Sequence, residues 1–401
     1  MQRWSASELH DTFGSIKTNK SLAFKALQAK EQKLYKELLA DKNKILALEN
    51  QNKKLQKHKS NTDAMIDALS KNRITLGDVH SLDKNRKFKL VGTGGNEEAC
   101  RNLFEEVFEK DISVEFWNWK YHGTLWRGVC VEKEGEIIAH YNGMRRDVLY
   151  FGKREKALQP CDTMVSPKAR GGFKKDSPFY NMVYTWLNIN IGRDKDFLLT
   201  YGFPNNRAMR LGEQLGFYKE VDTIKLLKWD TQYFDNTIKY HREKYLLKSS
   251  MDSEINTLWR SMARSFKHDV ICVRDANYVR RRYLLHPTTK YQVYVLRDND
   301  DTLVGLFVLR KTKTRMMLID IIAEVKDFSL IISEALTISD NEGSLLLDCW
   351  ITASKVGLFN RHDVEIIQTD ISIPISNITP EFDGDVVINK WFLMYGDSDF
   401  N

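Results

Sequence analysis

Between residues 125 and 230, the spacing of apolar positions alternates between the two-residue period of strands and the longer period of helices. Leu125–Lys133 and Glu136–Met144 alternate as two strands around an acidic-glycine turn, which predicts a β-hairpin. A third strand is expected at Cys161–Val165, and Phe179–Ile191 has the period of a helix. This part of the chain is therefore predicted to form a sheet with a helix after its third strand.

The stretch from Phe197 to Phe217 predicts a short buried strand followed by a second helix. The strand ends before Pro204, and the helix begins at Asn205 or Asn206, where an asparagine side chain can cap it. Gly216 ends the helix, and Thr223–Trp229 returns to the pattern of a strand. The whole order is hairpin, strand, helix, strand, helix and strand.

The same order recurs in a weaker form in the second half of the chain. A basic aromatic segment, Val279–Tyr283, precedes two strands separated by an acidic turn, as a similar segment precedes the first hairpin. The strands and helix expected here are Tyr291–Arg297, Leu303–Arg310, a strand around Ile319-Asp320, the helix Phe328–Thr337 and the strand Ser344–Thr352. A degenerate second copy of the same unit is predicted.

Residues 1–90 have a heptad pattern instead. Nine of the fourteen core positions between Phe24 and Leu69 are apolar, and no proline or glycine interrupts residues 15–76. Such sustained heptads predict a coiled coil, and Asn52 at a core position favours a parallel dimer. A long helix packed on its own domain, or a disordered basic arm, is the alternative.

The net charge of +7 belongs to this N-terminal region. Residues 1–90 hold 19 Lys and Arg against 10 Asp and Glu, so the remaining residues carry a net charge of −2. The basic residues lack the interleaved aromatic residues or the motifs of a nucleic-acid site, so no nucleic-acid partner is expected. Peripheral contact of the helix with an anionic membrane stays open.

Neither a membrane span nor a metal site is indicated. No apolar run approaches the roughly 18 residues that a spanning helix needs, and the polar N-terminus does not have the pattern of a signal peptide. The five cysteines are isolated from one another, without the spacing of metal ligands. Reduced, buried thiols in a cytoplasmic protein are expected.

Candidate chemistry lies between residues 161 and 217. Arg170-Gly171-Gly172-Phe173 links the third strand to the helix that follows. Glycines let the backbone approach a pyrophosphate, and a helix N-terminus adds unpaired N–H groups and a positive dipole end. An ordinary turn is the alternative for the loop.

The order and motifs together resemble the GNAT (Gcn5-related) N-acyltransferases. Three motifs make the resemblance more specific, and it covers about residues 87–401: Trp117-x-Trp119-Lys120-Tyr121, Asp162-x-Met164-Val165-x-Pro167 and Gly202-Phe203-Pro204-Asn205. They are similar to the tandem-GNAT enzymes that acylate nucleotide-linked amino sugars in bacterial surface-polysaccharide (lipopolysaccharide) pathways. The resemblance implies an α+β fold, a GNAT-like mixed sheet flanked by helices in two tandem copies after the N-terminal coiled coil. The expected domains are 1–86, 87–230 and 231–401.

The resemblance also implies a set of site residues, with acyl-CoA as cosubstrate. Cofactor contacts are expected at Met164, Val165, Arg170, Gly171, Gly172, Phe173, Asn205 and Ala208. The catalytic base is expected to be Asp162 or His140, on adjacent strands. The family often has a tyrosine where this chain has Gly212, so Tyr201, Tyr218, a water molecule or the second domain must protonate the leaving thiolate, or it leaves unassisted.

The acceptor is expected between the two copies. A diphosphate favours guanidinium donors, and Arg280 and Arg282 are expected to share one face of a strand, with Trp119 and Tyr121 from the motif nearby. The sequence thus predicts an acyl-CoA-dependent N-acyltransferase of an amino sugar, dimeric through the coiled coil. Two alternatives stay open: a non-catalytic coiled-coil scaffold with an inert GNAT body, and a tandem-GNAT ligase that uses aminoacyl-tRNA.

Overall fold

A computed structural model describes residues 88–170, 177–231, 241–245, 249–359, 363–377 and 383–399. The chain divides into two compact units after Asp67, and all the described residues belong to the second unit. The predicted coiled coil and the loop residues 171–173 therefore lie outside the described residues. Among the described helices, none is long and apolar enough to cross a membrane.

The first sheet contains the predicted hairpin. Its strand order is β1-β2-β3-β4-β5, and β8 and β14 join it beyond β3. The hairpin strand begins at Val129, because Leu125–Arg127 forms a 3₁₀ turn. The strands are β1 Lys89–Gly92, β2 Val129–Lys133, β3 Glu136–Tyr150, β4 Lys153–Val165, β5 Leu199–Thr200, β8 Val270–Cys272 and β14 Trp391–Phe392.

The second sheet contains the strands expected in the second half, together with one strand from the first half. Its order is β13-β6-β12-β11-β10-β9-β7. Strand β6 follows the unit that resembles the cofactor-binding half, yet it pairs with β12 and β13. The strands are β6 Tyr218–Asp230, β7 His241–Lys244, β9 Gln292–Arg297, β10 Leu303–Lys311, β11 Met316–Ala323, β12 Leu346–Thr352 and β13 Glu365–Ser376.

The two sheets share one sequence of strand pairings. In the first, β1, β2, β3 and β4 are antiparallel neighbours and β5 is parallel to β4. In the second, β7, β9, β10 and β11 are antiparallel neighbours and β12 is parallel to β11. A helix makes the parallel crossover in each case, α4 (Pro178–Asn190) and α8 (Phe328–Asn341).

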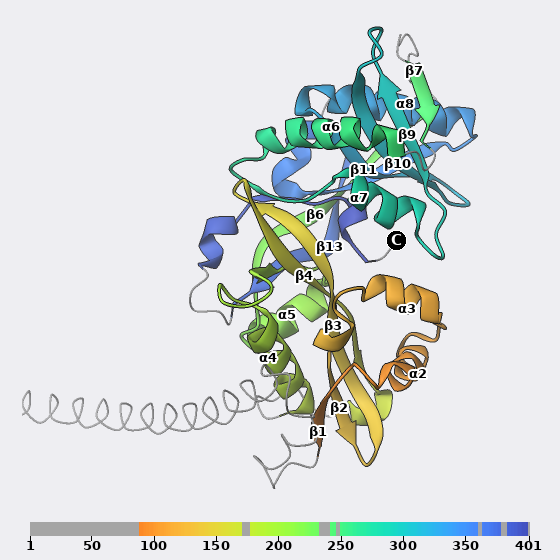
Figure 1. The fold of residues 1–401 in the computed structure, drawn as a ribbon. Coiled ribbons are helices and arrows are strands. Elements are labelled where there is room, and N and C mark those ends of the chain that lie inside the picture. Colours follow the sequence, from red (N-terminus) through yellow and green to blue (C-terminus); the bar gives the residue numbers. More distant parts are fainter. Residues whose placement is uncertain are drawn as a thin grey trace, which may run out of the picture. The chain divides into compact units, whose positions relative to one another are not determined.

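The helices of the first sheet lie on both of its faces. Figure 1 shows α2 and α3 on one side of β3 and α4 on the other. Side chains cap four of the described α-helices: Ser113 at α3, Ser177 at α4, Asn205 at α5 and Asp275 at α7. The remaining helices are α2 Glu97–Phe108, α3 Val114–Lys120, α5 Asn206–Gln214, α6 Asp252–Ser265 and α7 Ala276–Val279.

The last described segment, residues 383–399, connects the two sheets. Strand β14 pairs in parallel with β8 of the first sheet, and Met394 forms a bridge with Ile351 of β12 in the second. Trp391 and Leu393 are buried in one apolar cluster with residues of β3 and β6. Strand β6 from the first half of the chain lies in the second sheet, and β8 and β14 from the second half lie in the first. The two sheets are thus held together by these strands as well as by packed side chains.

One expected element differs in the structure. Arg280–Leu284 is a π-helical segment that continues α7, rather than a strand. Asp275 caps α7 by accepting a hydrogen bond from the Tyr278 N–H, so a helix start precedes the basic run. The expectation that strand alternation would place Arg280 and Arg282 on one face is therefore wrong.

Candidate active site

Strands β4 and β5 separate after two residue pairs. Leu158 is the last residue of β4 that pairs with β5, and its carbonyl accepts a hydrogen bond from the Tyr201 N–H at 3.2 Å. Pro160 is the next residue on the same side of β4. A proline has no N–H to donate, so it fits a position where the neighbouring strand has already ended.

A β-bulge lies in β4 beside this gap. The register with β3 shifts between His140 and Asn142, and Asp162 has a φ of 47°. Beyond the bulge, the Ser166 N–H donates to the Ile138 carbonyl of β3 at 2.9 Å. The backbone N–H groups of successive strand residues point to opposite edges of the strand. Because the N–H of Ser166 points to β3, the N–H of Val165 points away from β3 and toward the gap. The bulge and the gap together open the sheet at Asp162.

A cavity of about 830 Å³ occupies the opening. It lies between α2, α3, β4, the N-terminal ends of α4 and α5, and the start of β6. Its volume is toward the upper end of the roughly 300–1,000 Å³ of small-molecule sites. Residues that line it include Phe104, Lys120, Asp162, Val165, Arg170, Phe179, Tyr201, Arg207, Ala208, Leu211, Tyr218 and Asp399.

A buried polar cluster surrounds Asp162 on the cavity wall. Tyr121 Oη donates to one oxygen of Asp162 at 2.6 Å, and Lys120 Nζ donates to the other at 2.7 Å. Lys120 also contacts Asp399 Oδ2 at 3.3 Å, and Gln159 Nε2 donates to Asp399 Oδ1 at 3.1 Å. Two carboxylates therefore share one ammonium group, which fixes the position of both.

The local environment sets the protonation of the donors. Burial acts to lower the pKa of Lys120, but Asp162, Cys161 and Asp399 together outweigh burial, so the pKa lies above its ordinary value. Burial and the same carboxylate raise the pKa of Tyr121 well above its usual range. Burial also raises the pKa of Asp399. At neutral pH, Lys120 is charged and Tyr121 keeps its proton, so both donate to Asp162.

Tyr218 occupies the space that a side chain at position 212 would fill. A Cβ atom on Gly212 would lie 2.1 Å from the Tyr218 ring. The Tyr218 hydroxyl is 2.7 Å from the hydroxyl of Tyr141, and both residues line the cavity. Burial raises the pKa of Tyr218, so this phenol keeps its proton at neutral pH. The glycine at 212 is thus paired with a tyrosine from the next strand.

Tyr201 lines the same cavity, but its hydroxyl is directed elsewhere. It donates to the Asp397 carbonyl at 3.2 Å and lies 3.5 Å from Cys272 Sγ on β8. These partners join the first sheet to the last described segment. The geometry favours a structural role for the Tyr201 hydroxyl over the proton transfer expected from the sequence.

His140 does not reach the cavity. Its strand neighbours Ala139 and Tyr141 line the cavity, whereas the His140 side chain points to the opposite face of β3, where it is fully buried. Nδ1 lies 3.2 Å from the Asp162 carbonyl oxygen, and burial lowers the His140 pKa to about 4. Because His140 is buried and does not line the cavity, its position does not favour the expected role of base.

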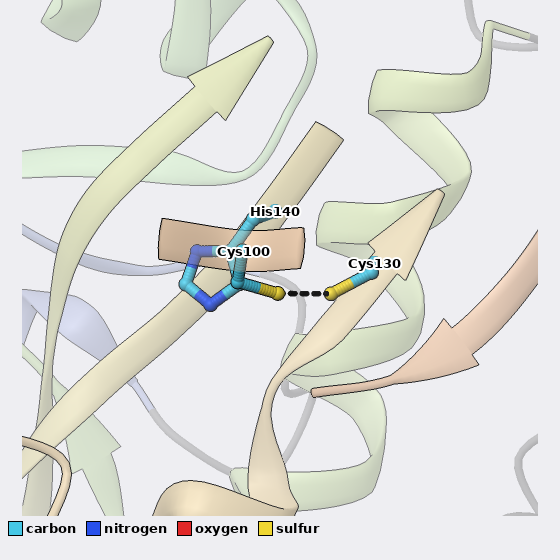
Figure 2. A group of neighbouring side chains, drawn as sticks. All are labelled: Cys100, Cys130 and His140. Atoms are coloured by element: carbon cyan, nitrogen blue, oxygen red, sulfur yellow. Dashed lines mark hydrogen bonds between the residues drawn. The ribbon is translucent and has the colours of Figure 1, made fainter. Parts of the chain in front are cut away.

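Instead, His140 lies beside two thiols, as Figure 2 shows. Cys100 Sγ and Cys130 Sγ are 3.4 Å apart, and the three ligand atoms of the group lie within 4.8 Å of one another. Two thiolates and a neutral imidazole could hold a zinc ion without net charge. The thiols contact each other, and burial and this hydrogen bond raise the Cys100 pKa far above its usual range. None of these three residues lines the cavity that Asp162 lines.

The expected cofactor residues divide into three groups. Val165, Arg170 and Ala208 line the cavity, and Arg170 Nε donates to the Val165 carbonyl at 3.2 Å. Met164 is fully buried and does not line it, and Asn205 acts as the cap of α5, accepting from the Ala208 N–H at 3.0 Å. The loop residues 171–173 lie outside the described part of the chain.

The expected acceptor residues are spread over different places. Tyr121 belongs to the cluster around Asp162, whereas Trp119 and Arg282 line a second cavity. Arg280 lines neither and forms an ion pair with Asp252 at 2.8 Å. Lys120 and Asp399 were not expected to reach the site, although both belong to segments that resemble the family.

Comparisons with known proteins identify the fold. No protein-family model and no curated protein sequence matches the chain. Solved structures do match: a conserved protein of unknown function from Enterococcus faecalis V583, described as a probable N-acyltransferase, has a TM-score of 0.57 at 9% identity over 73% of each chain. A GCN5-related N-acetyltransferase from Anabaena variabilis has a TM-score of 0.54 at 15% identity, also over 73% of each chain.

A GCN5-related N-acetyltransferase from Kribbella flavida is similar to the same extent, with a TM-score of 0.53 at 12% identity over 72% of this chain and 70% of its own. At such identities the likeness establishes the fold. The chain has the mixed α/β fold of the GCN5-related N-acetyltransferases, which confirms the predicted sheet flanked by helices.

Proposed function

We propose that this protein is an acyl-CoA-dependent N-acyltransferase that acylates a primary amine. The observation that carries the proposal is the cavity at the separated ends of β4 and β5, with the buried carboxylate of Asp162 on its wall. Acyl transfer to an amine needs a proton acceptor, donors for a developing oxyanion and a proton for the leaving thiolate. The cavity offers a residue for each of these needs.

Asp162 is the proposed proton acceptor. Its two oxygens accept from Tyr121 and Lys120, and an ionised carboxylate has lone pairs left for an amine proton. As the amine attacks the thioester, its proton passes to Asp162, and the N–H of Val165 stabilises the oxyanion. Collapse of the tetrahedral intermediate breaks the C–S bond and releases the thiolate of CoA, which Tyr218 protonates.

The donor is proposed to lie along the ends of two helices. Arg170, the N-terminal residues Pro178 and Phe179 of α4, and Ala208 near the start of α5 all line the cavity. Helix N-termini favour the phosphate groups of a nucleotide-linked thiol. Acyl-CoA meets this description, and the apolar lining at Phe104 suits an acyl chain.

For the acceptor we propose an amino sugar linked to a nucleotide, within bacterial surface-polysaccharide biosynthesis. The motifs at 117–121, 162–167 and 202–205 support it by their resemblance to such enzymes. Shared strand pairings in the two sheets support a second, degenerate copy of the fold. We also place the protein in the cytoplasm, on the evidence of its sequence.

The test is a mass-spectrometric assay of the full-length protein with acyl-CoA donors and nucleotide-linked amino sugars. The proposal predicts CoA release and a product heavier by one acyl group. Calorimetry of CoA binding accompanies it, and micromolar affinity is expected. If the folded protein binds no CoA, the catalytic proposal fails and the non-catalytic scaffold gains support. Acylation of a peptide from aminoacyl-tRNA would instead favour the ligase.

Tyr218→Phe should lower kcat by about 100-fold, the low end for acid–base catalysis, while the KM for acyl-CoA changes little. The phenyl ring still packs against Gly212, so only the proton donor is lost. Steady-state kinetics measure the effect. Tyr141→Phe is the control, because it removes the partner of the Tyr218 hydroxyl but leaves that hydroxyl in place. Equal losses in both variants would contradict the assignment.

The N-terminal region is proposed to pair through its heptads and to form a dimer. Deletion of residues 1–75 should therefore yield a smaller oligomer, with fewer chains per particle by light scattering, and little change in kcat per site. The control is the full-length protein at the same concentration. An unchanged number of chains per particle would show that the heptads have another role, such as contact with an anionic membrane.

A further inference from the structure

A second cavity, of about 320 Å³, lies between the first sheet and the π-helical segment after α7. Trp119 and His122 line one side of it, and residues of β3, β4, β8 and α7 line the others. Five arginines line this cavity: Arg145, Arg146, Arg154, Arg281 and Arg282. Two carboxylates accompany them, Asp147 and Asp275, so the lining has an excess of three positive charges.

The two carboxylates are already paired. Arg145 and Arg154 donate to Asp147 at 3.1 and 2.8 Å. Arg154 also lies 3.6 Å from Asp275. Both arginines are partly exposed, with 41% and 61% of the side chain accessible, so these pairs form the outer edge of the cavity.

The other three arginines contact neutral groups. Arg146 and Arg282 donate to the Gly396 carbonyl at 2.6 and 3.1 Å, and Arg282 also donates to the Ser398 carbonyl at 2.9 Å. Arg281 donates to the Trp119 carbonyl at 3.0 Å. In the described part of the chain, none of the three arginines lies within 4.0 Å of a carboxylate oxygen.

Burial makes this arrangement costly without an anion. Arg146 and Arg282 are 7% and 3% exposed, and the buried Nε of Arg146 has no hydrogen-bond partner among the described residues. Burial and the neighbouring arginines lower the pKa of Arg281. Buried charges are normally paired, and a buried donor is normally satisfied. An anionic ligand would supply both the missing charge and the missing acceptor.

The second cavity adjoins the catalytic cluster. Trp119 lines the second cavity, and the next residue of α3, Lys120, lines the first and binds Asp162. Gly396 and Ser398 hold the arginines, and Asp399 reaches the first cavity. A ligand with its anionic group among the arginines would therefore be held next to the site of acyl transfer.

We propose that the second cavity binds the phosphate or diphosphate group of the acceptor, with Arg146, Arg281 and Arg282 as its ligands. Planar guanidinium groups suit phosphate oxygens, and burial strengthens the bonds. Its assignment to the acceptor rests on the proposed function, whereas the anion site itself does not. Arg282 and Trp119 were also expected at the acceptor site from the sequence, whereas Arg281 takes the place of its neighbour Arg280.

The test measures pyrophosphate binding to the full-length protein by calorimetry in the presence of saturating CoA, so that the donor site is occupied. Arg281→Gln should weaken binding at least about tenfold, the lower end of what the loss of a hydrogen bond to a charged group costs. Arg280→Gln is the matched control and should leave the affinity unchanged, because Arg280 binds Asp252 outside the cavity. A nucleoside diphosphate should give the same ranking of variants.

The outcomes separate this inference from the proposed function. Equal affinities for pyrophosphate in wild type, Arg281→Gln and Arg280→Gln would overturn the anion site, even if CoA binds and acyl transfer occurs. Absence of CoA binding would overturn the proposed function, while pyrophosphate binding lost in Arg281→Gln alone would still support the anion site. In the acylation assay, Arg281→Gln should raise the KM of the phosphorylated acceptor about tenfold and leave the KM of acyl-CoA unchanged.

Discussion

Asp162→Asn should lower kcat by about 100- to 10,000-fold, the usual contribution of general acid–base catalysis. Asparagine is a clean replacement here, because it has nearly the same shape and tolerates the positive φ of 47° at this position. The amide has a single oxygen, so only one of Tyr121 and Lys120 keeps its acceptor, and the amide cannot take a proton from the amine. Acylation is measured with saturating acyl-CoA.

Two measurements separate a catalytic loss from a structural one. CoA affinity of Asp162→Asn, measured by calorimetry below its melting temperature, should stay close to that of the wild type, although loss of the buried ion pair with Lys120 lowers the melting temperature. Asp222→Asn is the matched control, since Asp222 is also buried but accepts from Ser354 and the Thr223 N–H, outside the cavity. Wild-type kcat in Asp162→Asn would remove this residue from the mechanism.

Arg274→Met should reduce the free energy of unfolding by about 3–5 kcal/mol, the range for breaking a buried ion pair. Arg274 is fully buried and donates to Asp320 at 2.8 Å and to Asp397 at 2.5 Å. Asp320 lies on β11 of the second sheet, and Asp397 belongs to the last described segment. Methionine fills part of the space but leaves two buried carboxylates without their cation.

Urea unfolding measures this effect, with Arg280→Met as control. Arg280 forms a partly exposed ion pair with Asp252, so its loss should cost no more than about 1 kcal/mol. Adding Asp320→Asn to Arg274→Met should recover part of the stability, because one stranded charge is removed. If Arg274→Met and Arg280→Met unfold at the same urea concentration, the buried network contributes little to stability.

The local pattern of the sequence was sufficient for the elements with strong signals. Helix α5 begins at its Asn205 cap, and the hairpin of β2 and β3 turns at the expected acidic-glycine pair, because turn and cap chemistry act over a few residues. The prediction of a strand at residues 280–282 was wrong, because a short run of basic residues has no apolar periodicity from which its secondary structure can be read. Asp275, a helix cap five residues earlier, was the available signal.

The site depends on contacts that a local pattern does not encode. Lys120 and Asp399 are 279 residues apart, and Cys100, Cys130 and His140 meet from three different elements. Tyr218 was among the proton donors expected from the sequence, and its ring fills the volume left by a glycine where the family has tyrosine. Arg281 could not be identified from the sequence, because only the helical conformation of its segment directs its side chain toward Trp119.

The last described segment, residues 383–399, affects when the two sheets can fold during synthesis. A ribosome produces most of the first sheet early, but β8 and β14, which complete that sheet, emerge later, and Asp399 emerges after all of the other described residues. Until then the faces that bury Trp391 and Leu393 lack their partners, and exposed apolar surface favours aggregation or chaperone binding. The proposed acyl transfer should therefore be gained in a single late step of synthesis, after both sheets have formed, rather than domain by domain.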